Sequence, residues 1–199
     1  MLRAKTKELR SFHAKDRNAW RKWLEKNHIA SPGVWLIYYK KSSGKIRLEY
    51  NDAVEEALCF GWIDSTSRPI DEEKYMQRFT PRKPKSGWSG LNKKRIEKLK
   101  AEGSMTKAGL EKIEAAIKDG SWNSLDHIDA VQLPEDLQKA LSKNKKAKDN
   151  FENFPLFTKK QFLYRINSAK RPATRKVRIK LTVKMAAANK KPTIEGFKL

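Results

Sequence analysis

Apolar residues in the first eighty positions follow two different periods, which predicts helices and strands in alternation. Three apolar side chains at helical spacing over residues 20–24 follow Asp16, whose carboxylate can accept the first backbone N–H groups of a helix. The uninterrupted apolar run at 34–39 predicts a buried strand. Alternating apolar and polar positions over 46–50 predict a second strand beside it.

The pattern then predicts a short helix and two further strands. Asn51 is a suitable N-cap for a helix with inward apolar residues at 54, 57 and 58, and Gly61 is placed to end it. The stretches 62–66 and 75–80 flank a polar turn and are typical of strands. The first eighty residues therefore predict a small α+β unit.

The rest of the chain favours helices. Helix starts are predicted at Asn92, Thr106 and Pro134, each followed by apolar residues at helical spacing. Thr158 and Gln161 have the spacing of a capping box between two phenylalanines, which is the clearest start signal in the chain.

Residues 177–185 fit two structures equally well. Apolar residues alternate strictly with basic or polar ones, which indicates a strand. Val177, Leu181 and Met185 are also four residues apart, and three alanines follow, which indicates a helix. The residues alone leave this segment open.

Length and composition describe a folded chain with a sizeable core. It has 199 residues, 38% of them hydrophobic, with six tryptophans. We predict the fold class α+β: a small mixed α/β N-terminal part at 1–90, a mainly helical C-terminal part at 91–192, and a tail at 193–199.

Charge is the most unusual property of the composition. The formal net charge is +22 at pH 7, so the surface attracts anions in general. Cys59 is the one cysteine, which excludes an internal disulfide and fits a reducing compartment. The N-terminal residues lack the apolar segment of a signal peptide, and no stretch approaches the ~18 apolar residues of a membrane span. We expect a cytoplasmic protein without a transmembrane segment.

One cluster of cations surrounds a tryptophan. Residues 77–95 contain seven cations and no acid, with two prolines that keep the backbone extended. Trp88 at its centre could stack on a base or a guanidinium plane, or it could be a core residue that covers a helix start. The predicted anion-binding residues of this cluster are Arg78, Arg82, Lys85, Trp88 and Arg95.

A second cluster occupies the C-terminal part. Residues 154–193 contain twelve basic residues and no acid. This stretch is either a solvated basic face or a surface that binds phosphate or another anion. The predicted anion-binding residues here are Lys170, Arg171, Arg175 and Arg178.

Signatures of other chemistry are lacking in the sequence. The three histidines are isolated, and no phosphate loop or dinucleotide fingerprint occurs, so we predict no catalytic, cofactor-binding or metal-binding residues. Cys59 lies on the apolar side of its predicted helix and is interpreted as a small buried hydrophobic residue. Glu55 and Glu56 are adjacent, point in different directions, and are interpreted as solvated.

Several motifs nevertheless occur together in a recognisable order. They resemble the YdeI/OmpD-associated family, also labelled bacteriocin-protection proteins, over roughly residues 10–192. The motifs that carry this resemblance are CFGWIDS at 59–65, RFTPRKPKSGWS at 78–89, Asn92 with Arg95, GSM at 103–105, Gly109-Leu110, AKRP at 169–172, Thr174-Arg175 and Arg178-Ile179.

The resemblance implies a two-part protein with an α+β N-terminal part and a helical C-terminal part. It favours a helix over 172–188. The family's names come from an association with envelope proteins and with resistance to antimicrobial peptides. The resemblance carries no catalytic residues over to this chain.

Three functional hypotheses follow. The first is a non-enzymatic cytoplasmic protein, active in stress resistance, that binds an anionic ligand or an acidic partner through a basic surface. The second is an enzyme for a small anionic, phosphorylated substrate, with Asp64 as base and with Arg78 and Arg82 holding the anion. The third is a basic nucleic-acid-binding protein. The charge could also serve solubility alone.

Overall fold

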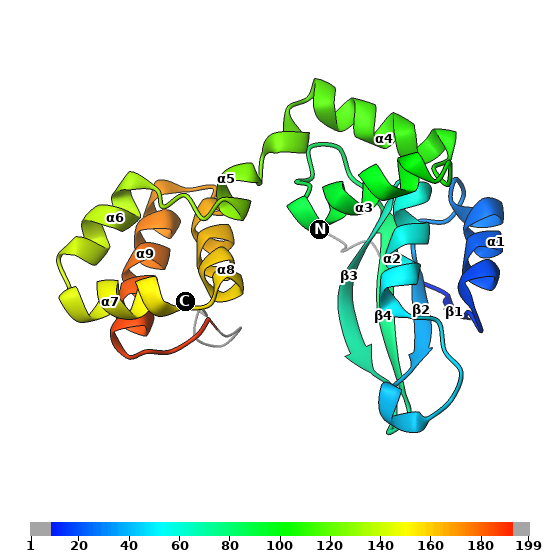
Figure 1. Ribbon diagram of the computed structural model, residues 1–199, viewed down its shortest axis with the longest axis horizontal. Coiled ribbons are helices and arrows are strands. Elements are labelled where there is room, and N and C mark those ends of the chain that lie inside the picture. Colours follow the sequence, from blue (N-terminus) through cyan, green and yellow to red (C-terminus); the bar gives the residue numbers. More distant parts are fainter. Residues whose placement is uncertain (1–8, 193–199) are drawn as a thin grey trace, which may run out of the picture. The chain divides into compact units, whose positions relative to one another are not determined.

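The computed structural model describes residues 9–192 and divides into two compact units, Met1–Ser124 and Leu125–Leu199 (Figure 1). The first combines a sheet with helices and the second is helical, which confirms the α+β class. The boundary falls later than the expected one after residue 90, because Ile96, Leu99 and Ile113 are buried in the core of the first unit. The predicted tail at 193–199 lies outside the described residues.

The N-terminal unit contains a four-stranded sheet in the order β1-β2-β4-β3. Strand β1 runs parallel to β2, and the other neighbours are antiparallel. The strands expected at 34–39, 62–66 and 75–80 are confirmed, the last two with longer bounds, whereas three-residue β1 has too little pattern to be predicted. The bounds are β1 Ser11–His13, β2 Val34–Tyr39, β3 Trp62–Pro69 and β4 Lys74–Pro81.

The strand expected at 46–50 is wrong. Residues 44–49 are irregular after a short 3₁₀ helix at Lys41–Ser43, and helix α2 (Tyr50–Cys59) begins there with Glu49, not Asn51, as its N-cap. The antiparallel neighbour of β2 is β4, more than thirty residues along the chain. Because β1 and β4 occupy both edges of β2, no edge remains for a local hairpin.

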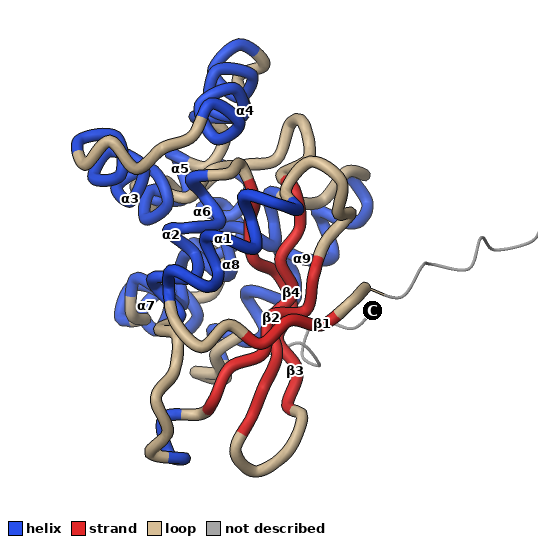
Figure 2. Tube along the Cα trace, turned by 90° about the vertical axis from the view of Figure 1, so that its right-hand side faces the viewer, coloured by secondary structure: helices blue, strands red, loops and turns tan. Residues whose placement is uncertain are grey.

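Helices α1 (Arg17–Asn27) and α2 cover one face of the sheet (Figure 2). The Asp16 carboxylate accepts the backbone N–H of Ala19 at 2.7 Å, which confirms the predicted N-cap. Trp20 and Leu24 of α1 are fully buried against the sheet. The side chains of β2 alternate between this covered face and the opposite face, which we call the open face.

Helices α3 (Gly90–Ala101) and α4 (Lys107–Lys118) complete the unit, followed by a 3₁₀ turn at Ser121–Asn123. Helix α3 begins two residues before the expected start at Asn92, with Ser89 as its N-cap, and the Ser89 hydroxyl accepts the Asn92 N–H at 3.4 Å. The predicted cap Thr106 is confirmed for α4, and its hydroxyl also donates to the Cys59 carbonyl at 2.6 Å. This second bond ties α4 to the end of α2.

The C-terminal unit buries a second core, formed by residues such as Leu137, Phe151 and Phe162. The helix expected from Pro134 is confirmed, with Pro134 as its N-cap rather than its first residue, while α5 and α7 were not predicted. The predicted capping box is wrong: the N-cap of α8 is Pro155, three residues before Thr158, and Thr158 is buried inside the helix. The helices are α5 Asp126–Asp129, α6 Glu135–Ser142, α7 Lys145–Asn153, α8 Leu156–Asn167 and α9 Pro172–Ala187.

The ambiguous segment at 177–185 is helical, as the family resemblance implied. It lies within α9, whose first residue is Pro172. Ile179, Thr182 and Met185 are buried at helical spacing, and the Thr182 hydroxyl donates to the Arg178 carbonyl, so its polar group is satisfied. The alternation of apolar and polar residues therefore does not indicate a strand here, because the buried residues follow the helical period.

Glu55 and Glu56 are not solvated, contrary to expectation. Glu55 is 7% exposed and Glu56 is 3% exposed. Helix α1 supplies the counter-charges: Arg17 Nε donates to Glu56 Oε1 at 2.6 Å, and Arg21 Nη1 donates to Glu56 Oε2 at 2.8 Å. The two acids therefore hold α1 against α2 rather than facing water.

Candidate functional site

Trp88 of the first cationic cluster is a core residue. It is 2% exposed, and the Cζ atom of Arg82 lies 3.5 Å from its ring centroid. Arg82 is itself 5% exposed, and its Nη1 donates to the Gly87 carbonyl at 3.2 Å. Burial lowers the pKa of Arg82 to about 10, although the Asp64 carboxylate raises it. The stacking partner of Trp88 is thus a guanidinium of the same chain, and its ring is closed to an external base.

Of the remaining residues of this cluster, Lys85 lies beside that pair, whereas Arg78 and Arg95 do not line the same cavity. Lys85 shares a cavity of about 50 Å³ with Arg82 and Trp88, which has room for water but not for a nucleotide. Arg78 is exposed on β4. Arg95 lies on α3, where its guanidinium donates to Asn92 at 2.9 Å and to Asn51 at 2.7 Å.

The strand register contradicts the predicted catalytic arrangement. Asp64 is opposite Phe79, so its side chain is on the covered face, whereas Arg78 precedes Phe79 and points to the open face. The Asp64 carboxylate accepts the Tyr50 hydroxyl at 2.8 Å and the Gln77 amide at 3.0 Å. Asp64 and Arg78 therefore lie on opposite faces of the sheet, so the structure does not bring together these two residues of the predicted arrangement.

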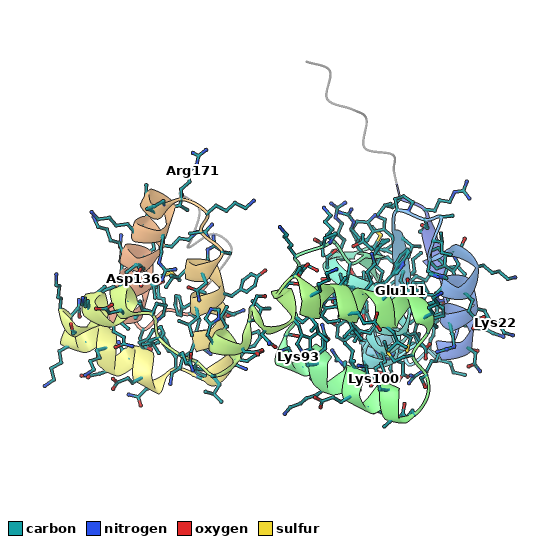
Figure 3. The ribbon with its side chains drawn as sticks, turned by 90° about the horizontal axis from the view of Figure 1, so that it is seen from above. Lys22, Lys93, Lys100, Glu111, Asp136 and Arg171 are labelled. Carbon is teal, nitrogen blue, oxygen red and sulfur yellow. The ribbon has the colours of Figure 1, made fainter. Side chains whose placement is uncertain are left out.

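The second cationic cluster divides into two kinds of residue. Arg175 binds Asp136 with two bonds, Nε to Oδ2 at 2.6 Å and Nη2 to Oδ1 at 2.9 Å. Arg178 donates to the Arg165 carbonyl and to the Ser168 hydroxyl. Lys170 and Arg171 are exposed in the turn before α9, and Figure 3 shows Arg171 extending away from the helices of its unit. Of the four residues, Lys170 and Arg171 are exposed, whereas Arg175 and Arg178 are half-buried and bonded within the protein.

A groove between α6 and α9 gathers further cations that the sequence did not single out. Its volume is about 680 Å³, within the usual range of ligand sites. Its floor is apolar and its rim is cationic. We call it the α6–α9 groove; its lining residues are Asp136, Lys139, Ala140, Lys143, Pro172, Arg175, Lys176, Ile179, Lys180 and Val183.

The charges of the groove are unevenly neutralised. Asp136 is paired with Arg175, and exposed Lys139 pairs with Glu135. Among the described residues, no carboxylate lies within ion-pair distance of Lys143, Lys176 or Lys180. Three ammonium groups thus border an apolar floor. The sequence signal was the acid-free stretch 154–193, but the groove itself depends on the packing of α6 against α9.

The Asp136–Arg175 pair predicts a pH-dependent difference in stability. The hydrogen bond from Arg175 lowers the pKa of Asp136. A lowered carboxyl pKa adds stability above its ordinary value of about 3.9, and that stability is lost as pH falls through the folded-state pKa. Asp136→Asn should therefore lower the free energy of unfolding by about 1 kcal/mol at pH 7 and by progressively less below pH 4.

Urea unfolding followed by far-UV circular dichroism between pH 7 and pH 3 measures this difference. Asp149→Asn is the matched control, because the exposed Asp149 carboxylate makes no ion pair among the described residues. If Asp136→Asn changes the free energy of unfolding by the same amount at every pH, the ion pair contributes nothing to stability.

Cys59 is a structural residue, as interpreted from sequence. It is fully buried, and burial raises the pKa of its thiol to about 11. A thiol with so high a pKa is a weak nucleophile at neutral pH.

The described part of the chain carries neither a metal-site cluster nor a membrane-spanning helix. Between residues 9 and 192, no three or more His, Cys, Asp or Glu side chains gather as a metal site would require. Within the same range, no helix combines the length and the apolar character needed to cross a bilayer.

Fold and groove together define a two-unit α+β protein with a cationic, apolar-floored groove in its helical C-terminal unit. The chain belongs to the family described as Domain of unknown function (DUF8412), whose model matches residues 12–112. Residues 130–189 match the model of the family described as Bacteriocin-protection, YdeI or OmpD-Associated. No curated protein and no solved structure matches the chain.

The second match confirms the resemblance seen in the sequence and places it in the C-terminal unit. The motifs quoted between residues 59 and 110 lie within the stretch that the other family matches. The groove-lining residues from Asp136 to Val183 all fall within 130–189.

Proposed function

We propose that this protein is a non-enzymatic binding protein that holds an acidic, amphipathic helix of a partner protein in the α6–α9 groove. The observation that carries the proposal is the combination of an apolar floor and a cationic rim in one groove. An anion without apolar surface would leave the floor uncovered, and an apolar ligand without charge would leave the ammonium groups unused.

The dimensions of the groove support a helical occupant. Helix α9 has 16 residues and is therefore about 24 Å long, enough to lie along several turns of a partner helix. Ile179 and Val183 can contact apolar residues of the occupant, while Lys176 and Lys180 lie one helical turn apart and can face its carboxylates. Burial of apolar surface provides affinity, and charge complementarity provides orientation and a fast association rate.

A designed peptide tests the proposal. The probe is a fluorescent peptide of about five helical turns with leucines on one face and glutamates on the other. We expect anisotropy titrations to show saturable binding that weakens between about 50 mM and about 200 mM salt, as electrostatic screening requires. The same peptide with lysine for each glutamate should not bind.

Variants locate the binding site. Lys176→Gln/Lys180→Gln should weaken binding about tenfold, or ~1.4 kcal/mol, and Ala140→Glu should abolish it by placing a carboxylate on the groove floor. Lys145→Gln/Lys146→Gln removes the same charge from exposed positions on α7, outside the groove, and should change the affinity less than twofold. Equal weakening by both double variants, or unchanged binding by Ala140→Glu, would contradict the proposal.

A further inference from the structure

The open face of the N-terminal sheet carries aromatic and basic side chains side by side. Trp35, Ile37 and Tyr39 of β2 are half-buried there, because their alternate neighbours fill the core on the covered face. Opposite residues of an antiparallel pair share a face, so Trp35 lies beside Arg78 and Tyr39 beside Lys74. In Figure 2 the helices α1 and α2 lie on the other side of the strands.

Cations already contact both aromatic rings of this face. The Arg68 guanidinium carbon is 4.9 Å from the Trp35 ring centroid. The Nζ atoms of Lys45 and Lys74 are 5.0 Å and 5.4 Å from the Tyr39 ring centroid. Each ring therefore has a positive charge within reach of any group that stacks on it.

Positive charge continues along the same face. A depression is lined by Arg78, the residue opposite Trp35, and by Lys83, with Ser65, Thr80 and two prolines. Among the described residues, the one ion pair of these open-face cations joins Lys45 to Glu73. Arg68, Arg78, Lys74 and Lys83 thus form a row of cations from the depression to the Tyr39 end of the sheet.

We propose that the open face binds single-stranded nucleic acid, with bases stacked at Trp35 and Tyr39 and phosphates held by Arg68, Arg78 and Lys74. The two rings are four residues apart on one strand, or about 13 Å, a distance that suits two to three successive nucleotides of an extended strand. Base–aromatic stacking is stronger than an exposed cation–π contact, so a base can displace the cation above each ring, which then turns to the phosphate.

A duplex fits this face poorly. Its bases are stacked on each other and present only their edges, so the rings of Trp35 and Tyr39 would remain unused. A membrane surface offers negative charge but no flat rings to stack, and an acidic peptide has no ring at each successive residue as a single strand has at each nucleotide. Aromatic rings with adjacent cations therefore favour a single strand over these partners. The inference uses none of the residues of the α6–α9 groove and does not depend on the function proposed for it.

Anisotropy titration of the full chain with fluorescent oligonucleotides tests the inference. The probes are single-stranded DNA and RNA of one sequence and the corresponding DNA duplex. We expect tighter binding of both single strands than of the duplex, with log affinity falling with log salt at a slope of about 0.7 per phosphate contact. A preference for RNA over DNA would identify contacts to the 2′-hydroxyl, whereas equal or tighter binding of the duplex would overturn the inference.

Two pairs of variants separate stacking from charge. Trp35→Leu keeps the net charge and should weaken single-strand binding about tenfold, and Tyr39→Leu should do the same independently. Arg68→Gln/Arg78→Gln should weaken it about tenfold or more and reduce the salt slope. Lys176→Gln/Lys180→Gln in the other unit removes the same charge and should change the affinity less than twofold.

The outcomes are decisive in both directions. Unchanged affinity in both leucine variants, with near-native circular dichroism, would overturn the inference. So would equal weakening by the two glutamine pairs, because binding would then follow net charge alone. If the protein binds the oligonucleotides but does not bind the designed acidic peptide, only the groove proposal is contradicted.

Discussion

Gly109→Ala is expected to destabilise the N-terminal unit by about 3 kcal/mol, because the added methyl group would overlap the backbone of α2. A Cβ atom at Gly109 would lie 2.3 Å from the Cys59 carbonyl oxygen and 2.8 Å from its carbon. These are backbone atoms, so no side-chain rotation can relieve the overlap. Helix α4 would have to move away from α2.

That movement would also break the bonds that hold α4 in place. The Thr106 hydroxyl and backbone N–H both donate to the Cys59 carbonyl, at 2.6 Å and 3.2 Å. Helix α4 supplies Ile113 to the core through this contact. The cost therefore combines steric overlap, lost hydrogen bonds and an opened core.

Urea unfolding followed by tryptophan fluorescence measures this effect in the relevant unit, since all six tryptophans precede residue 125. Gly103→Ala is the control. A Cβ there meets open space, so only the left-handed backbone, with φ of 66°, should matter, at a cost of about 1 kcal/mol. Equal destabilisation by the two substitutions would show that the close approach of α4 and α2 is not the cause.

Arg17→Gln/Arg21→Gln is expected to destabilise the same unit by about 3–5 kcal/mol, because it leaves Glu56 buried without a cation. The Glu56 side chain is 4% exposed and is bound by both arginines, at 2.6 Å and 2.8 Å. Glu55 also loses its bond to Arg17 but keeps Lys98 at 3.1 Å. Glu56 therefore dominates the expected loss.

Adding Glu56→Gln to this double variant should recover a large part of the lost stability, since a neutral amide costs less to bury than a carboxylate. Lys22→Gln/Lys26→Gln is the matched control on the exposed side of the same helix, and Figure 3 shows Lys22 pointing outward. It removes the same charge and should change stability by less than about 0.5 kcal/mol. If the triple variant is no more stable than the double variant, the unpaired Glu56 carboxylate is not the cause of the destabilisation.

Local signals predicted much of the fold. Asp16 and Thr106 cap the helices expected of them, and the apolar run at 34–39 is strand β2. The expectation failed where a longer-range partner prevailed. Residues 46–50 alternate like a strand, but β4 takes the edge that they would need. Thr158 and Gln161 have the spacing of a capping box, yet Thr158 is buried inside α8 in the core of the helical unit.

The candidate sites were predictable only in part. Arg171 and Lys170 are exposed as a binding role requires, whereas Arg82 and Trp88 satisfy each other inside the protein. A run of cations in sequence does not specify which of them will find a carbonyl, a carboxylate or an aromatic ring. That choice is made by neighbours that are distant along the chain, such as Asp136 for Arg175.

The sequence by itself determined the α+β class, most helix and strand positions, the family of the C-terminal unit and the excess of positive charge. These properties depend on composition, on periodicity and on caps within a few residues of each other. Only the tertiary structure decided the partner of β2, the burial of Glu56 and Trp88, and the groove between α6 and α9. Each of these arises from contacts between residues far apart in the chain, which no local pattern contains.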